Sequence, residues 1–169
     1  WAEILLRLDG EMVEATVESA LFHTLSAGVT AIGESLQAPC LLPGILGKVA
    51  GLVESWGLRG ALSYQASEEH GYEQGQAGLA ENAELLERCR CKGFRHLTAY
   101  VCADGSPKSS DALREGAEGM AWDAEARCLF HTAGAVQHFT WIGGQGRVYT
   151  PLLYLLAQAE SATLLLLQN

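Results

Sequence analysis

Apolar and polar positions follow one another in blocks along the chain, and the spacing within each block changes between helical and extended. Apolar residues at helical spacing, closed by glycine or by lysine and glycine, predict helices. Such helices are expected over 11–28, 42–57 and 77–93, from the N-cap residues Ser109 and Ser110 to about Trp122, and over 147–161, starting near Pro151. The buried face of the first is predicted to comprise Met12, Val13, Val17, Leu21 and Leu25.

Between these helices lie short runs of apolar and β-branched residues, each bounded by turn residues. They predict buried strands at 29–34, 58–67, 96–103, 126–133 and 162–168. Polar or glycine-rich segments at 68–76, 104–111 and 135–146 are expected to be loops or turns. Continuous apolar strands that alternate with helices are typical of a parallel α/β sheet covered on both faces.

The chain is predicted to form a single domain over residues 1–169. No internal repeat, low-complexity segment or linker divides it, and this length is enough for one core. A hydrophobic content of 49% with 18% charged residues is typical of a globular protein.

The net charge of -9 and the absence of basic runs argue against a nucleic-acid partner, which needs a positive surface. No apolar stretch approaches the roughly 18 residues of a membrane span, and the N-terminal residues lack the layout of a signal peptide. The chain is therefore expected to have no membrane partner.

The cysteines point to a reducing compartment. Five of them, Cys40, Cys89, Cys91, Cys102 and Cys128, follow neither a disulfide pattern nor a zinc pattern, although Cys89 and Cys91 form a weak C-x-C metal signal. Reduced thiols of this kind predict a cytoplasmic protein.

Ligands of parallel α/β folds bind at the carboxyl ends of the strands. The predicted strands place there Glu34, Ala66–Ser67, Cys102–Asp104, His131–Gly134 and Gln168–Asn169. His131 is the leading candidate, because an imidazole can bind a metal or move a proton. A catalytic zinc needs about three protein ligands, and Glu34, Cys102 and Gln168 could converge with His131 on such an ion. The alternative is that His131 binds no metal and only makes hydrogen bonds to its neighbours.

The remaining polar features are predicted to be structural or solvated. They are the histidines His23, His70, His96 and His138. The acidic pairs Glu68–Glu69 and Glu81/Glu84 are predicted to be solvated. Gly143, Gly144 and Gly146 precede a predicted helix and could cradle a phosphate, or form a flexible loop, but they match neither G-x-G-x-x-G nor a P-loop.

A family resemblance extends over five segments: 1–39, 57–71 with 78–89, 99–118, 128–134 and 162–169. They resemble metal-dependent amidohydrolases of the SsnA-like, ATZ/TRZ type. Residues 1–39 resemble the segment after that family's first barrel strand, and 57–71 with 78–89 resemble its next strand, loop and helix. AYVCADGSPKSSDALREGAE (99–118) resembles a strand that ends in a histidine and a capped helix. CLFHTAG (128–134) resembles the strand with the His-x-Ala-Glu motif, and ATLLLLQN (162–169) resembles the strand ending in Leu-Ala-His. The order and spacing agree over nearly the whole chain.

The resemblance implies a (β/α)8 barrel, which typically needs about 250 residues, and a metal that activates water. We therefore expect a partial TIM-type barrel of about five strands. Position by position, His131 matches a metal histidine, whereas Gly134 stands at the acid/base glutamate, Gln168 at a second metal histidine and Cys102 at a substrate-facing histidine. The family's histidine pair would precede Trp1, and its last metal aspartate would follow Asn169.

The resemblance therefore predicts a pseudoenzyme. A lone histidine cannot hold zinc tightly, and without a carboxylate at position 134 no residue there shuttles protons. We expect an inactive scaffold without a cofactor, in which a protein partner or a second copy covers the sheet edges. Two alternatives are a zinc-dependent aminohydrolase whose other ligands come from elsewhere, and a small Rossmann-like domain that binds an anion at Gly143–Gly146.

Overall fold

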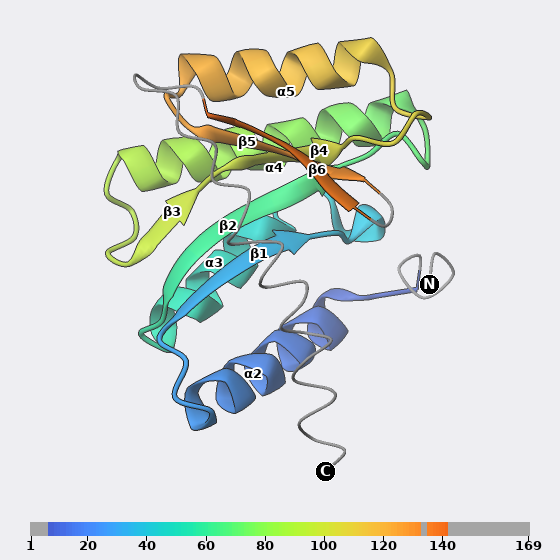
Figure 1. Ribbon diagram of the computed structural model, residues 1–169. Coiled ribbons are helices and arrows are strands. Elements are labelled where there is room, and N and C mark those ends of the chain that lie inside the picture. Colours follow the sequence, from blue (N-terminus) through green and yellow to red (C-terminus); the bar gives the residue numbers. More distant parts are fainter. Residues whose placement is uncertain (1–6, 133–134, 142–169) are drawn as a thin grey trace.

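The computed structural model describes residues 7–132 and 135–141, in which helices alternate with strands (Figure 1). The helices are α2 (Gly10–Ser26), the short 3-10 helix η1 (Pro39–Leu41), α3 (Ile45–Ser55), α4 (Tyr72–Arg90) and α5 (Asp111–Asp123). The strands are β1 (Ala31–Leu36), β2 (Arg59–Ala66), β3 (Leu97–Ala99), β4 (Val101–Asp104), β5 (Arg127–Thr132) and β6 (Ala135–Trp141). The predicted α/β class is confirmed; the helix and strand predicted over 147–161 and 162–168 lie outside the described residues.

The strands form one sheet in the order β1-β2-β4-β5-β6, with β3 also paired to β2. β1 to β5 are parallel, whereas β6 runs antiparallel to β5. The prediction of a loop over 135–146 is therefore wrong for Ala135–Trp141. Only two residues separate β5 from β6, and so short a connection can join antiparallel neighbours but not parallel ones, which need a long crossover.

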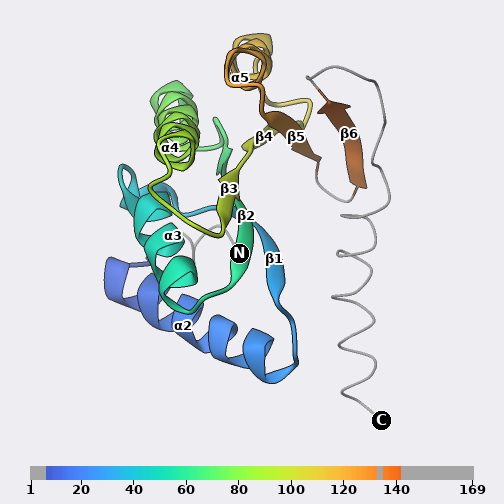
Figure 2. The same cartoon turned by 90° about the vertical axis from the view of Figure 1, so that its left-hand side faces the viewer.

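The helices of the described part lie on one face of this sheet (Figure 2). α3, α4 and α5 pack on the strands, and α2 packs against α3. The prediction of helices on both faces is thus wrong for these residues. One-sided cover is also what the wall of an α/β barrel has, although the sheet described here is open.

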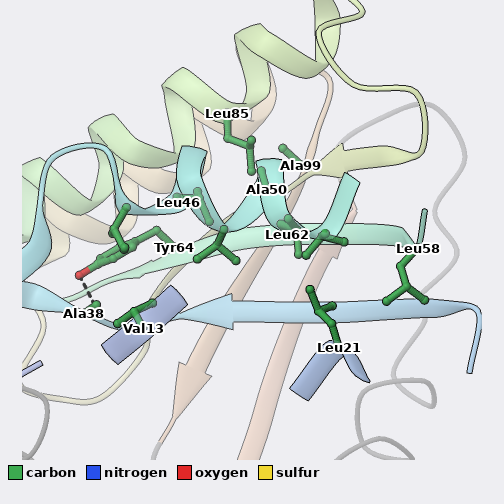
Figure 3. Close-up of a cluster of buried hydrophobic side chains, with 13 residues drawn as sticks. Val13, Leu21, Ala38, Leu46, Ala50, Leu58, Leu62, Tyr64, Leu85 and Ala99 are labelled. Atoms are coloured by element: carbon green, nitrogen blue, oxygen red, sulfur yellow. Dashed lines mark hydrogen bonds between the residues drawn. The ribbon is translucent and has the colours of Figure 1, made fainter. Parts of the chain in front are cut away.

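The larger of two hydrophobic clusters, here called the β1–β2 core, lies between β2 and the helices α2, α3 and α4 (Figure 3). Its largest members point from β2 and α3 toward each other and include Leu46, Val53, Leu58, Leu62 and Tyr64. Full burial of a side chain of this size stabilises a fold by about 1.5–3 kcal/mol. This cluster therefore anchors the first half of the chain.

The second cluster, here called the β4–β5 core, joins β4 and β5 to α4 and α5. It contains Ala66, Leu79, Val101, Ala103, Leu113, Ala117, Ala121, Cys128 and Phe130. Because Val101 and Ala103 face the helices, the residues between and after them, Cys102 and Asp104, face the opposite side of the sheet.

Helix α4 begins at Tyr72, five residues before the predicted start at residue 77. Glycines lower helix propensity, which favoured a loop over 68–76. In the fold, however, Gly75 is buried within α4: a Cβ atom at this position would lie 2.7 Å from the Glu68 Cγ and 3.2 Å from the Leu113 Cδ1 of α5. Close packing of α4 against its neighbours therefore outweighs local propensity here.

The strand predicted over 96–103 is interrupted at Tyr100, which separates β3 from β4. The buried side chain of Asn82, on α4, lies at this interruption. Its Oδ1 accepts the Tyr64 N–H at 2.7 Å, and its Nδ2 donates to the carbonyls of Tyr64 (2.8 Å) and Cys102 (3.2 Å). Asn82 thus satisfies backbone groups of β2 and β4 and connects the two cores.

Helix α2 departs from its predicted buried face. Val13 and Leu21 are buried and Val17 is partly buried, but Met12 is 53% and Leu25 38% exposed. The helix ends in a Schellman motif, in which the Val29 N–H bonds to the Thr24 carbonyl at 3.1 Å. The apolar stripe is therefore wider than the surface that α3 covers.

Candidate functional site

The predicted site residues of β4 and β5 share one face of the sheet, opposite the helices. This surface, here called the inner face, comprises Ser35, Ser63, Gln65, Cys102, Asp104 and His131, as strand alternation and register place them. Asp104 and His131 are directly paired across β4 and β5. The structure thus brings two strand-end candidates side by side, whereas the residues predicted to converge with His131 were Glu34, Cys102 and Gln168.

Cys102 is fully buried, and burial raises the pKa of its thiol to about 12. The hydroxyls of Ser35 and Ser63 lower this pKa in part, whereas the nearby Asp104 raises it. Ser35 Oγ makes no hydrogen bond of ordinary geometry, so its effect is one of proximity. At neutral pH Cys102 is a neutral thiol, which is neither a nucleophile nor a metal ligand.

Asp104 is half-buried, and its carboxylate already has partners. Oδ1 accepts the Ser106 N–H at 2.8 Å, and Oδ2 accepts the Ser106 hydroxyl at 3.0 Å. This arrangement is an Asx turn that starts the loop before α5. A ligand at Asp104 would have to share this carboxylate with the turn.

His131 lies near the end of β5 with an exposed side chain. Its backbone carbonyl accepts the Gly105 N–H at 2.8 Å, which ties β5 to the loop after β4. Among the residues that the structure describes, no three His, Cys, Asp or Glu side chains are grouped so that they could hold a metal ion. Gly134, Gln168 and Gly143–Gly146 lie outside those residues.

Glu34 lies within β1 rather than at its end, because β1 continues to Leu36. This corrects the predicted strand, 29–34, by two residues. The Glu34 carbonyl accepts the Tyr100 hydroxyl at 3.0 Å and the Ser63 hydroxyl at 3.4 Å. Tyr100 thus reaches across β2 to β1 on the inner face.

Two of the acidic residues predicted to be solvated are instead bound to backbone N–H groups. Glu81 is 3% exposed, and its carboxylate accepts the N–H groups of Gly44 and of Leu46, the latter at 2.9 Å. These groups belong to the first turn of α3, where a negative charge is favourable. The prediction for Glu81 is therefore wrong, because α3 leaves its own N-terminus without a side-chain cap.

Glu68 does the same for α5. Its carboxylate accepts the N–H of Ser110 at 2.8 Å and the hydroxyl of Ser110 at 2.9 Å. Ser110 is the N-cap of α5, as predicted, and its hydroxyl accepts the Leu113 N–H. Both glutamates therefore have structural roles that their spacing in the sequence does not indicate.

A small cavity at the carboxyl ends of β1 and β2 escaped the sequence prediction, which named Ser67 only as a strand-end residue and His70 as structural or solvated. It is lined by Gln37, Pro39, Tyr64, Gln65, Ser67, His70 and Gln74. Three glutamines close to two strand ends could have indicated a polar cavity. Polar residues are common in loops, however, so this pattern is not specific.

The cysteine and membrane predictions can be compared with the described residues, which include all five cysteines. None of them forms a disulfide bond within the described residues, and the Cys91 thiol bonds to the Glu87 carboxylate at 3.2 Å. No helix in the described ranges has the length and apolar character needed to cross a membrane.

Comparisons with protein-family models, with curated proteins and with solved structures each found no match. The class that fold and site define is therefore an α/β protein with a mainly parallel sheet and helices on one described face.

Proposed function

We propose that the chain is a non-catalytic scaffold of amidohydrolase type that acts through protein–protein contacts. The observation that carries the proposal is an exposed apolar surface, here called the α2 patch, formed by Phe22, Leu25 and Val29 at 58%, 38% and 41% exposure. It lies at the end of α2, directly before the edge strand β1. Clustered apolar exposure of this kind is typical of interaction sites.

The state of the inner face also supports this proposal. Cys102 stands where the resemblance places a substrate-facing histidine, and its buried neutral thiol cannot replace an imidazole. Asp104 is engaged by Ser106. The residue at the position of a substrate-facing histidine is thus part of the packed sheet, and the strand-end carboxylate Asp104 serves turn formation.

Native mass spectrometry of wild type, Phe22→Asp and Trp122→Asp tests the proposal. Trp122 is 66% exposed on α5, away from the α2 patch, and provides the matched control. We expect an assembly larger than a monomer for wild type and Trp122→Asp, and its loss in Phe22→Asp. A wild-type protein that remains monomeric at high concentration contradicts the proposal.

A second candidate, a metal-dependent aminohydrolase completed by ligands from elsewhere, is favoured by one observation. Asp104 and His131 are paired across neighbouring strands on the same face, at the end of the sheet where such ligands belong. Metal analysis separates the two functions: one zinc per chain that is lost in His131→Ala supports the hydrolase and contradicts the scaffold.

A further inference from the structure

The small cavity at the carboxyl ends of β1 and β2 has a volume of about 10 Å³, which matches the space that one water molecule needs. Its wall contains three side-chain amides, two hydroxyls and an imidazole. A cavity of this polarity is favourable for a hydrogen-bonding molecule and unfavourable when dry.

Gln74 provides the clearest sign of a ligand. It lies in the first turn of α4, and its Oε1 is buried without a hydrogen-bond donor among the described residues. A buried amide oxygen without a donor loses its hydration and gains nothing in return. A donor inside the cavity would remove this deficit.

Tyr64 supplies a complementary group on the β2 side of the cavity. Its hydroxyl oxygen accepts the Ala38 N–H at 3.2 Å, and burial raises its pKa to about 12, so the group keeps its proton. The hydroxyl can therefore also donate, as can that of Ser67. The wall thus offers both an acceptor and donors to one small molecule.

We propose that this cavity binds one ordered water molecule, which donates a hydrogen bond to Gln74 Oε1 and accepts one from a hydroxyl of the wall. The water connects the first turn of α4 to the ends of β1 and β2. Gln74 and the water together position the loop that carries His70. The proposal is independent of the function proposed above.

Two measurements test this water site. In wild type, nuclear Overhauser experiments between water and protein should show a long-lived water at the Tyr64 and Gln74 side chains, and Gln74→Leu should abolish the signal. The same substitution at the exposed Gln76, on the same helix, is the control and should leave the signal unchanged. Leucine and glutamine have similar helix propensities, so the comparison isolates the lost amide.

Thermal unfolding tests the water site independently, through the direction in which the melting temperature changes. If the water is present, Gln74→Leu removes one of its partners and should lower the melting temperature by a few degrees relative to Gln76→Leu. If the cavity is dry, the same change deletes an unsatisfied acceptor and should raise the melting temperature. Absence of the water signal in wild type, or a higher melting temperature in Gln74→Leu, overturns the proposal.

Discussion

The β1–β2 core and the β4–β5 core share the same layers, a strand pair under helices, but they differ in the size of their side chains. Four of the nine buried members of the β4–β5 core are alanine, whereas only three of the thirteen in the β1–β2 core are. In the first half of the chain, large aliphatic groups fill most of the space between sheet and helices. In the second half, small groups fill more of the space between α5 and the strands β4 and β5.

This difference implies opposite sensitivities to mutation. A core filled by large side chains loses most when one is shortened, because a cavity remains. A core built from alanine has little volume to lose, but an added side chain has nowhere to go. Asn82 belongs to both regions, since it binds backbone groups of β2 and β4.

The largest effect is predicted for Asn82→Ala. The change leaves three backbone groups at Tyr64 and Cys102 without their side-chain partner, and each buried unsatisfied group costs about 1–3 kcal/mol. We expect the free energy of unfolding to fall by about 3–5 kcal/mol in urea denaturation. Gln76→Ala, at an exposed position of the same helix, should change it little.

A smaller loss of unfolding free energy in Asn82→Ala would mean that Asn82 does not connect the two cores. If Asn82→Ala costs less than about 1 kcal/mol, water or strand pairing replaces the amide, and the interruption at Tyr100 does not depend on Asn82. Hydrogen exchange of the Tyr64 amide would show which of these holds.

The next largest effect is predicted in the β1–β2 core. Leu62 is fully buried at its centre, and Leu62→Ala should lower the free energy of unfolding by about 3 kcal/mol, within the range for buried leucines. Met12→Ala, at a residue 53% exposed and outside the α2 patch, serves as the control and should cost far less. Equal losses at both positions would contradict the placement of Leu62 in the buried core.

The β4–β5 core should show the reverse behaviour in Ala117→Leu. Ala117 is fully buried on α5, and the added side chain should cost about 2 kcal/mol through overpacking. Ala112→Leu places the same residue at an exposed position of the same helix and should be nearly neutral. Melting temperatures of the two variants measure the difference, and a neutral Ala117→Leu would refute tight packing of α5.

The sequence predicted most elements of both regions, because apolar periodicity reports which residues meet a core. It failed where tertiary contacts override local signals. Gly71 and Gly75 favoured a loop over 68–76, yet α4 begins at Tyr72 and runs through Gly75, where a Cβ atom would crowd Glu68 and Leu113. Residues 135–141 carry no clear alternation, and their pairing with β5 follows from the short connection rather than from composition.

Strand order selected Asp104 and His131 as strand-end residues, but it did not indicate that they pair with each other or how each is bonded. The structure pairs them across β4 and β5. Burial of the Cys102 thiol and the engagement of Asp104 by Ser106 depend on neighbours from β1 and from the following loop. No spacing rule reports that Glu81 binds the first turn of α3, because the partners are distant in the chain and are backbone groups.

The smallest loss of stability is predicted for alkaline pH, and it arises from two buried cysteines on β4 and β5. Burial raises the pKa of Cys102 and Cys128 to about 12, from 9.0. Above pH 9 the unfolded chain loses these protons while the folded chain keeps them, so stability decreases as pH rises. Tyr64, in the β1–β2 core, titrates from 10.0 when unfolded and contributes only at higher pH.

Between pH 9 and pH 10 each buried thiol should therefore cost about 1 kcal/mol of unfolding free energy. Urea denaturation under reducing conditions at both pH values measures this loss. The double variant Cys102→Ala and Cys128→Ala should have a lower stability at pH 8 but a flatter dependence above pH 9, because the other titrating groups are unchanged. An equally steep dependence in the double variant would place the alkaline sensitivity outside the β4–β5 region.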